Sequence, residues 1–260
     1  MNALHPLHNS HREVQKMKRS SIVIAFFFLL CGFLLPLDAK TLFHDDFSDG
    51  NNWQDNWYQL GSPGLEITQV DGHLEVQSSK GTASKQVSAI TKDTYDFTNG
   101  MTFEGVLTSS GPDEVQFWVA EGDGKGNAED DPWFTINWIR VMLANSSIFL
   151  QRAKPGGEGF DGEGNIPMLE GTPYKISVYM KPQDCKVYVD GKQIIARKHE
   201  QNYTKAHLIF ASWTGATAVK ENHKIDDVFI YEGDYVAKPS IAVKTEGKLT
   251  ATWGSIKIQY

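Results

Sequence analysis

The sequence predicts an all-β protein, a sandwich of two antiparallel sheets, from two observations on the residues after position 40. Apolar and polar side chains alternate along many short runs, and a period of two is typical of strands with one buried face. No long run in this part repeats apolar residues every three to four positions, as an amphipathic helix would. Roughly a dozen short strands with turns between them are typical of a sandwich or barrel.

The N-terminal segment has the layout of a signal peptide. Lys16, Lys18 and Arg19 precede an apolar run, Ile22–Leu35. The run has about 14 residues, whereas a helix that crosses a bilayer needs about 20, so we expect a cleaved signal rather than a membrane anchor. A cut near Ala39 predicts a secreted or extracytoplasmic protein with no membrane span after signal removal.

The sequence predicts three parts: a signal peptide that is cleaved off, a β-sandwich domain and a C-terminal extension. Residues 1–39 form the signal peptide, with Met17 as an alternative start, and residues 40–233 form the β-sandwich domain. Residues 234–260 form an extension whose alternating apolar residues predict a hairpin packed on the sandwich. We expect structural roles for Trp53, Trp57 and, in the extension, Trp253.

The mature chain is acidic and has one cysteine. The full chain has 25 basic and 32 acidic residues; the signal removes four and two of these, which leaves 21 and 30 and a net charge of −9. Nucleic acids are bound by basic surfaces, so this charge argues against them as partners. Cys185 has no partner for an intramolecular disulfide, so the core must stabilise the domain, and about 220 residues suffice for one core.

The alternation sets the expected positions of the strands. In 172–181, Tyr174, Ile176, Val178 and Met180 share one face of a strand. Asp190-Gly191, between two apolar runs, predicts a tight hairpin because both residues tolerate positive φ. The other expected strands are Leu65–Gln69, His73–Gln77, Met101–Leu107, Glu114–Ala120, Trp133–Leu143, Ser147–Ala153, Ala206–Trp213 and Lys224–Tyr231. Segments 121–132 and 154–165, rich in glycine and aspartate, are expected to be long loops at one rim.

Three motifs then resemble a known superfamily. Leu42–Gly50 reads Leu-Phe-His-Asp-Asp-Phe-Ser-Asp-Gly, Tyr174–Ile194 contains Val-Tyr-Val-Asp-Gly, and Ile225–Tyr231 reads Ile-Asp-Asp-Val-Phe-Ile-Tyr. In this order they resemble the opening strand, a hairpin and the closing strand of concanavalin A-like lectins and glucanases, which include laminin-G-like (LamG) domains. The resemblance spans 42–232 and implies a jelly roll with a face or rim open to a ligand. It does not choose a function, because this fold serves lectins, hydrolases, lyases and adhesion modules.

The enzyme interpretation depends on carboxylates that share one strand face. Laminarinase-type members of the superfamily carry Glu-x-Asp-x-(x)-Glu, and retaining hydrolysis needs two carboxyl groups about 5 Å apart. The best matching strand here has Glu114, but Gln116 and Trp118 take the later places. A polysaccharide lyase would use Tyr, His and Arg, for which Arg140 and His207 are available without the lyase motifs. We assign no catalytic residue.

The binding interpretation uses the outward face of the same strands. With Val115, Phe117 and Val119 in the core, the side chains at 114, 116 and 118 point outward, and an outward Trp can stack on a pyranose while amides and carboxylates bond its hydroxyls. Strand 133–143 is ambiguous; the register that we adopt places Phe134, Ile136 and Trp138 in the core. The candidate ligand-binding residues are Glu114, Gln116, Trp118, Trp133, Asn137, Gln151 and, at a strand end, Trp213.

Calcium is the ion that we expect, in a structural role. Related jelly rolls hold it between the first and last strands, and transfer by motif position implicates Asp46, the Gly50 carbonyl and Asp226. The acidic loop Asp123–Asp131 is a second candidate. The leading hypothesis is a secreted lectin or LamG-like module that binds glycan or polysaccharide. The alternatives are a glycoside hydrolase or polysaccharide lyase with diverged catalytic residues, and a non-catalytic adhesion domain.

Overall fold

The computed structural model describes the part of the chain that follows the expected signal peptide, with gaps. The described residues are 39–48, 52–61, 65–77, 85–111, 113–122, 137–144, 146–153, 163–198, 202–214 and 222–235. The chain divides into two units, 1–38 and 39–260, and every described residue belongs to the second. None of the described helical segments is long and apolar enough to cross a membrane. Residues 1–38 of the expected signal peptide, the acidic loop 123–131 and residues 236–260 of the expected C-terminal hairpin lie outside the described residues.

Two antiparallel sheets of eight strands each form the domain, which confirms the predicted all-β sandwich. The strands of the first sheet are β1 (Thr41–Asp45), β3 (Ile67–Val70), β4 (His73–Gln77), β7 (Met101–Thr108), β12 (Pro173–Lys181), β13 (Asp184–Val189), β14 (Lys192–Arg197) and β16 (Asn222–Glu232). Their spatial order is β14-β13-β12-β7-β16-β4-β3, and β1 pairs with the second half of β16.

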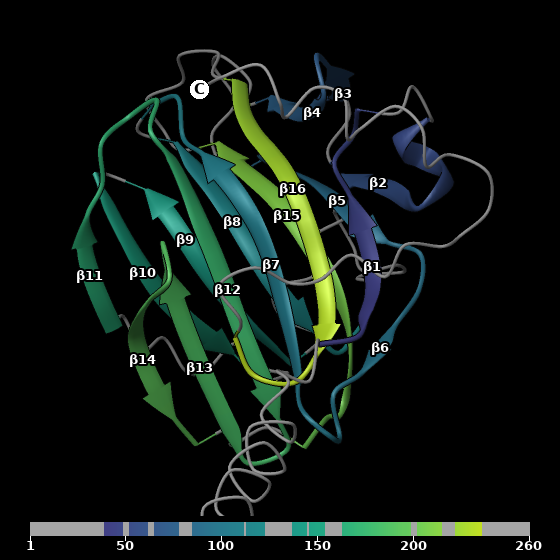
Figure 1. Cartoon of the computed structure of the whole chain (residues 1–260). Helices are drawn as coiled ribbons and strands as arrows, with labels where there is room; N and C mark the ends of the chain where they lie inside the picture. Colours follow the sequence, from purple (N-terminus) through teal and green to yellow (C-terminus); the bar gives the residue numbers. More distant parts are fainter. Residues whose placement is uncertain are drawn as a thin grey trace, which may run out of the picture. The chain divides into compact units, whose positions relative to one another are not determined.

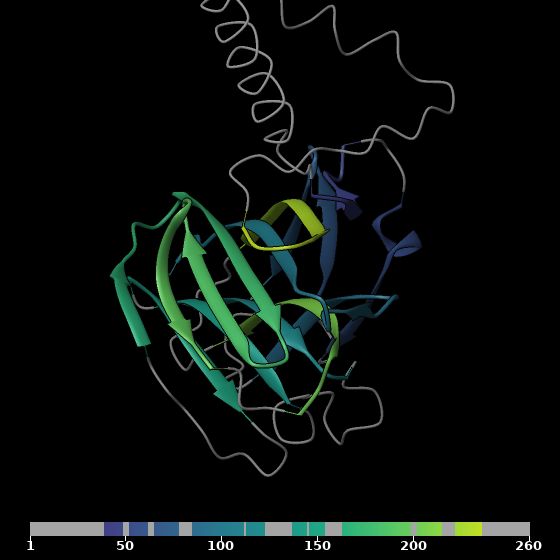
Figure 2. The same ribbon diagram turned by 60° about the horizontal axis from the view of Figure 1, so that its bottom comes forward.

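The second sheet lies behind the first in Figure 1, and the turned view of Figure 2 shows the two layers facing each other. Its strands are β2 (Trp57–Gly61), β5 (Lys85–Thr91), β6 (Tyr95–Asp96), β8 (Glu114–Ala120), β9 (Trp138–Ala144), β10 (Ser147–Ala153), β11 (Glu163–Pro167) and β15 (Lys205–Thr214). The order is β11-β10-β9-β8-β15-β5-β2, and β6 pairs with the start of β15. The first and last described strands are neighbours, as expected for a jelly roll.

Alternation along the strands fills the space between the sheets. In β12 the buried side chains Ile176, Val178 and Met180 face the core, as the sequence predicts. Val115 and Phe117 of β8 meet them from the second sheet. Burial of one aliphatic or aromatic side chain contributes about 1.5–3 kcal/mol, so several dozen of them offset the entropy that the chain loses on folding.

Tryptophan packs the opening of the domain into this core. The indole of Trp57 is fully buried, its Nε1 donates to Oδ2 of Asp45 at 2.9 Å, and its ring lies 5.6 Å from the rings of Phe43 and Phe210. Trp53 is also buried. The structural role predicted for both is therefore confirmed.

The turn chemistry agrees with the sequence at the β13–β14 hairpin. Asp190 has φ 49° and Gly191 has φ 78°, so both residues of the Asp-Gly pair adopt the positive φ of a primed turn. Asp227 also has a positive φ, 50°, at a β-bulge where the register of β16 against β7 shifts between Asp226 and Phe229.

Two expectations on the strands were wrong, and some short elements were not foreseen. A 3₁₀-helix, η1 (Trp53–Asp55), interrupts the all-strand pattern because the side chain of Asn52 caps it by accepting from the backbone N–H of Gln54. Strand β11 begins inside the segment 154–165, which was expected to be a loop, so this expectation was wrong. The elements η1, β2, β5 and β6 were not foreseen. Trp138 does not face the core, because it lies opposite Ala120 on the other face of β8.

Cys185 lies in β13 and is fully buried in the core between the sheets. Burial raises the pKa of its thiol to about 12, since a low-dielectric surrounding disfavours the thiolate. The thiol is free in the folded domain.

Gly105 of β7 allows two aromatic rings to reach the centre of the core. A Cβ atom at this position would lie 2.9 Å from Cζ of Phe210 and 3.5 Å from the ring of Phe117, which meet edge to face at 5.3 Å. We predict that Gly105→Ala lowers the free energy of unfolding by about 1–3 kcal/mol, because overpacking forces the rings out of place. Urea denaturation measures this loss.

The double variant Gly105→Ala with Phe210→Leu provides the control. Removal of the Phe210 ring makes room for the new methyl group. The double variant should therefore lose less unfolding free energy than the sum of the losses in the two single variants. Losses that add without coupling would show that the contact with Phe210 is not the cause.

Candidate functional site

The face of the second sheet that points away from the core carries the candidate site. Directly opposite residues of antiparallel strands share a face, and Trp118 of β8 lies opposite Arg140 of β9 and Ile209 of β15. Arg140 in turn lies opposite Gln151 of β10. Side chains that are far apart in the sequence therefore form one row across four strands.

Six side chains on this face of the second sheet form one network, which we call the Arg140 cluster: Glu114, Gln116, Trp118, Trp138, Arg140 and Gln151. The guanidinium of Arg140 lies 5.3 Å from the ring centre of Trp118 and 4.9 Å from that of Trp138, within the range of cation–π attraction. The two indole rings lie 5.1 Å apart. Stacking against both rings restricts the guanidinium to one orientation.

Hydrogen bonds join the Arg140 cluster from β10 to the start of β8. Nε of Arg140 donates to Oε1 of Gln151 at 2.8 Å, and one Nη atom donates to the same oxygen. The other Nη donates to Oε1 of Gln116 at 3.2 Å, which also accepts from Nε1 of Trp118 at 2.8 Å. Nε2 of Gln116 then donates to Oε2 of Glu114 at 2.6 Å.

Glu114 and Trp213 form the accessible end of the site. They lie opposite each other on β8 and β15, and both are half-buried. Burial raises the pKa of the Glu114 carboxyl above its ordinary value, and the charge of Asp113 adds to this rise. The positive charge of Arg140 and the hydrogen bond from Gln116 act in the opposite direction. A carboxylate thus stands beside a partly exposed indole ring.

The structure brings together most, but not all, of the predicted ligand-binding residues. Glu114, Gln116, Trp118 and Gln151 belong to the Arg140 cluster, and Trp213 adjoins it. The expectation that Trp118 and Gln116 are open to a ligand was wrong: both are fully buried, because the indole rings and the Arg140 side chain pack over one another. Glu114, Gln151 and Trp213 remain half-buried.

Two further predicted residues do not join the cluster. Asn137 donates to the carboxylate of Glu121, at the place where β8 ends and β9 begins. Its neighbour Trp138 is the first residue of β9, and successive side chains of a strand point to opposite faces. Trp133 lies outside the described residues.

Sequence reasoning missed Arg140 and Trp138 as members of the site. The register of β9 was inferred from Phe134 and Ile136, which placed Trp138 in the core. The residues from 139 to 143 read Ile, Arg, Val, Met, Leu, and their aliphatic members match the core face of β8. A register taken from this end of the strand would have placed Arg140 beside Trp118.

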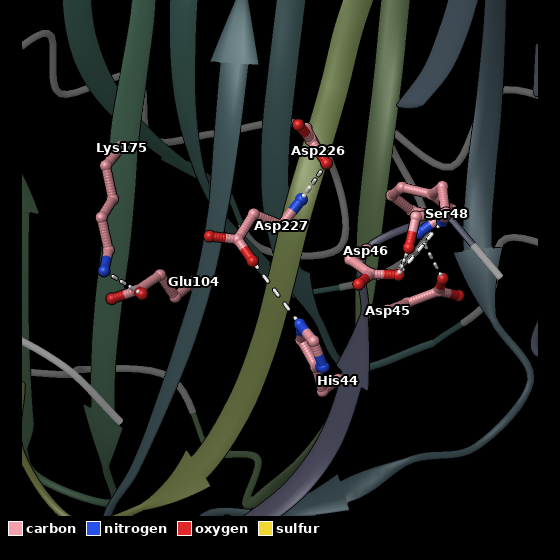
Figure 3. A network of polar contacts seen from close by, with 9 residues as sticks. His44, Asp45, Asp46, Ser48, Glu104, Lys175, Asp226 and Asp227 are labelled. Atoms are coloured by element: carbon pink, nitrogen blue, oxygen red, sulfur yellow. Dashed lines mark hydrogen bonds and ion pairs between the residues drawn. The ribbon is translucent and has the colours of Figure 1, made fainter. Parts of the chain in front are cut away.

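Two of the predicted calcium ligands, Asp46 after β1 and Asp226 in β16, are close enough for the charge of one to act on the other, and Figure 3 shows both. Burial and the charges of Asp227 and Asp46 raise the pKa of Asp226. One oxygen of Asp46 accepts from the N–H and the hydroxyl of Ser48, and Oδ1 of Asp226 accepts from the N–H of Asp227. Within the described ranges no three His, Cys, Asp or Glu side chains form a cation site. Gly50 is outside them, so these residues fit only part of a calcium shell.

The other polar contacts of Figure 3 stabilise the first sheet. Nε2 of His44 lies 3.5 Å from Oδ1 of Asp227, and the His44 ring stacks on Phe229 at 4.1 Å. Glu104 is buried, accepts from the Ser177 hydroxyl at 2.7 Å and pairs with Lys175. Burial raises the pKa of Glu104.

Comparisons with known proteins identify the fold. No protein-family model matches the chain, and no curated protein matches its sequence. The potassium-bound carbohydrate recognition domain of Emp46p is 13% identical with a TM-score of 0.57, and the match covers 75% of this chain and 97% of that domain. A LamA variant from Z. galactanivorans, solved in complex with laminaritriose and laminaritetraose, is 15% identical with a TM-score of 0.58, over 74% and 99%.

A Bacillus subtilis protein with a galectin-like fold is similar at the same level, 15% identical with a TM-score of 0.56, over 75% of this chain and 98% of that one. The domain therefore has the concanavalin-like lectin and glucanase fold that its motifs indicate. The same architecture holds binding domains and enzymes, so the site has to be argued from its own residues.

The neighbours of Glu114 predict how the pKa of its carboxyl group changes when they are replaced. Asp113→Asn should lower the pKa of Glu114, because it removes a negative neighbour, and Gln116→Met should raise it, because it removes a hydrogen bond to the ionised form. Carboxyl carbon shifts followed by NMR between pH 3 and 8 measure both, and thermal unfolding checks that each variant is folded. Shifts in the same direction, or a wild-type pKa in the ordinary range, would contradict this assignment.

Proposed function

We propose that this domain is a carbohydrate-binding module and that its glycan binds at the half-buried ends of the outward face of the second sheet, at Glu114 and Trp213 on β8 and β15 and at Gln151 on β10. The observation that carries the proposal is the half-buried Trp213 beside the half-buried Glu114, at the end of the hydrogen-bonded Arg140 cluster. An indole face stacks on the apolar face of a sugar ring, and a carboxylate accepts hydrogen bonds from its hydroxyls. The pair supplies both contacts at one place.

The buried part of the Arg140 cluster supports these contacts. Gln116 holds one oxygen of Glu114, and Trp118 and Arg140 in turn hold Gln116. A carboxylate whose orientation is already set loses little side-chain entropy when a ligand binds. The half-buried amide of Gln151, at the other end of the network, adds a second polar contact.

A polysaccharide-degrading enzyme is the second candidate function. Glu114 favours it, since a carboxyl with a raised pKa in a partly buried site is typical of a general acid. Gln116 and Trp118 support binding instead, because they stand where a glucanase of this fold would carry further carboxylates. Release of new reducing ends from glucans, or of unsaturated products from uronates, would decide for the enzyme.

We propose secretion or another extracytoplasmic location, supported by the basic and apolar residues before Ala39. We also propose that calcium, coordinated in part by Asp46 and Asp226, joins β1 to β16 and contributes to stability rather than to binding. The nearness of the two carboxylates supports this, because a divalent cation would relieve their repulsion.

Trp213→Ala should reduce glycan retention roughly 5- to 150-fold, since the loss of one aromatic contact is worth about 1–3 kcal/mol. A glycan array probed with residues 40–260 measures retention. Because Trp213 is half-buried, the variant should keep its fold, which circular dichroism and thermal unfolding check.

Two matched variants complete this experiment. Trp118→Ala removes a fully buried indole and should cost about 3–5 kcal/mol of stability, so its loss of binding would follow from unfolding. Leu169→Ala alters a side chain that is 71% exposed and lies outside this face, and should leave both properties unchanged. Full retention by Trp213→Ala would remove this face as the glycan site.

Calcium should raise the midpoint of thermal unfolding, whereas EDTA should lower it. The shift should vanish in Asp226→Asn, which keeps the side-chain shape but loses a charged oxygen ligand. Differential scanning calorimetry in calcium chloride, potassium chloride and EDTA measures it. A shift of equal size in Asp226→Asn, or one produced by potassium alone, would exclude this calcium site.

A further inference from the structure

Arg140 determines which atoms of two amide side chains face outward. A guanidinium only donates hydrogen bonds, and an amide accepts them only through its oxygen. Arg140 donates to the Oε1 atoms of both Gln116 and Gln151, so both oxygens point toward Arg140 and both Nε2 atoms point away from it. The amide oxygen and nitrogen have nearly the same size, so their hydrogen bonds to Arg140 are what distinguish the two orientations of each amide.

This orientation gives the site a polarity. Nε2 of Gln116 is used by Oε2 of Glu114, which leaves Oε1 of Glu114 as an acceptor at the β8 end. Nε2 of Gln151 remains as a donor at the β10 end. Within the described residues no other hydrogen bond engages these two atoms, and both side chains are half-buried rather than covered.

The two ends are too far apart for one sugar ring. Gln151 lies two strands from β8, in the row of Trp118, and Glu114 lies four residues before Trp118 on β8. Strand spacing and rise per residue place the Cα atoms of Gln151 and Glu114 roughly 16 Å apart. A ligand that contacts both must therefore be an oligosaccharide longer than one sugar ring.

We propose that Arg140 is a positioning residue that presents the acceptor of Glu114 and the donor of Gln151, and that the site thereby selects uncharged oligosaccharides over uronates. The inference rests on the proposed function and names its ligand class. Sugar hydroxyls donate and accept, so they suit both ends. A uronate carboxylate only accepts and is repelled by Glu114. Arg140 itself is 1% exposed and offers no direct contact to such a carboxylate.

Gln151→Glu is the decisive variant. A carboxylate at this position still accepts from Arg140, so the network and the fold persist, but the outward donor is lost. Binding of laminarihexaose, chosen as a neutral probe, should fall at least about tenfold. Glu114→Gln removes the repelling charge and should narrow the preference for the neutral probe over a hexamer of mannuronate.

Arg140→Lys and Arg140→Met test the positioning role. Lysine keeps the charge, but it is a point donor and cannot hold two amides at once, so it should behave like methionine in binding. Both should weaken laminarihexaose binding about tenfold and reduce the preference for it over the uronate. Thermal unfolding and circular dichroism show which variants are folded; if methionine unfolds the domain, lysine and the two variants above decide.

Isothermal titration distinguishes a failure of the inferred selectivity from a failure of carbohydrate binding itself. The probes are glucose, laminarihexaose, cellohexaose and the hexamers of mannuronate and galacturonate. Tighter binding of uronates than of neutral hexamers would overturn the inference and leave the proposed function standing. Glucose that binds as tightly as the hexamers would also overturn it. No binding of any saccharide, here or on the glycan array, would overturn both. An unchanged preference in folded Arg140→Lys would remove Arg140 from its role.

Discussion

The register between β8 and β9 is the constraint on which the candidate site depends. It places Trp118 opposite Arg140 and Ala120 opposite Trp138, so the guanidinium meets two indole rings and two amides at once. A shift of one residue would exchange Arg140 for Ile139 or Val141 and expose the core face of β9. The aliphatic side chains that β9 buries between the sheets thus secure the position of its polar ones. The register between β8 and β9 therefore determines both the packing of the core and the geometry of the site.

The site also shows how a sheet can bury both of its faces. Val115, Phe117 and Val119 face the core, while Gln116 and Trp118, between them in sequence, are fully buried on the other side. Burial of polar groups is tolerated when they are hydrogen-bonded, and each side-chain bond recorded for Gln116 joins it to another member of the cluster. The rigid part of the face is therefore covered, and its half-buried ends, Glu114, Trp213 and Gln151, carry the proposed contacts.

The parts of the fold that local patterns determine were predictable. The primed turn at Asp190-Gly191, the core face of β12 and the strands at 73–77, 114–120 and 147–153 agree with the sequence, because period and turn chemistry are properties of adjacent residues. Site membership depends on pairing between distant strands, which no local pattern specifies. Trp118 and Gln151 were recognised by residue type, whereas Arg140 and Trp138 needed the register. The burial of Trp118 was missed for the same reason, since its covering partners come from β9.

The buried thiol of Cys185 can be used to measure how often the domain opens, because reagents reach it only when β13 leaves the core. With its pKa raised to about 12 and no exposed surface, the thiol reacts neither with oxidants nor with alkylating reagents while the sheets stay packed. Its rate of modification in the native state therefore counts the excursions in which β13 separates from the core. In an oxidising compartment, a disulfide between two copies of the chain would require the same opening, because folded molecules offer no exposed Cys185 sulfur.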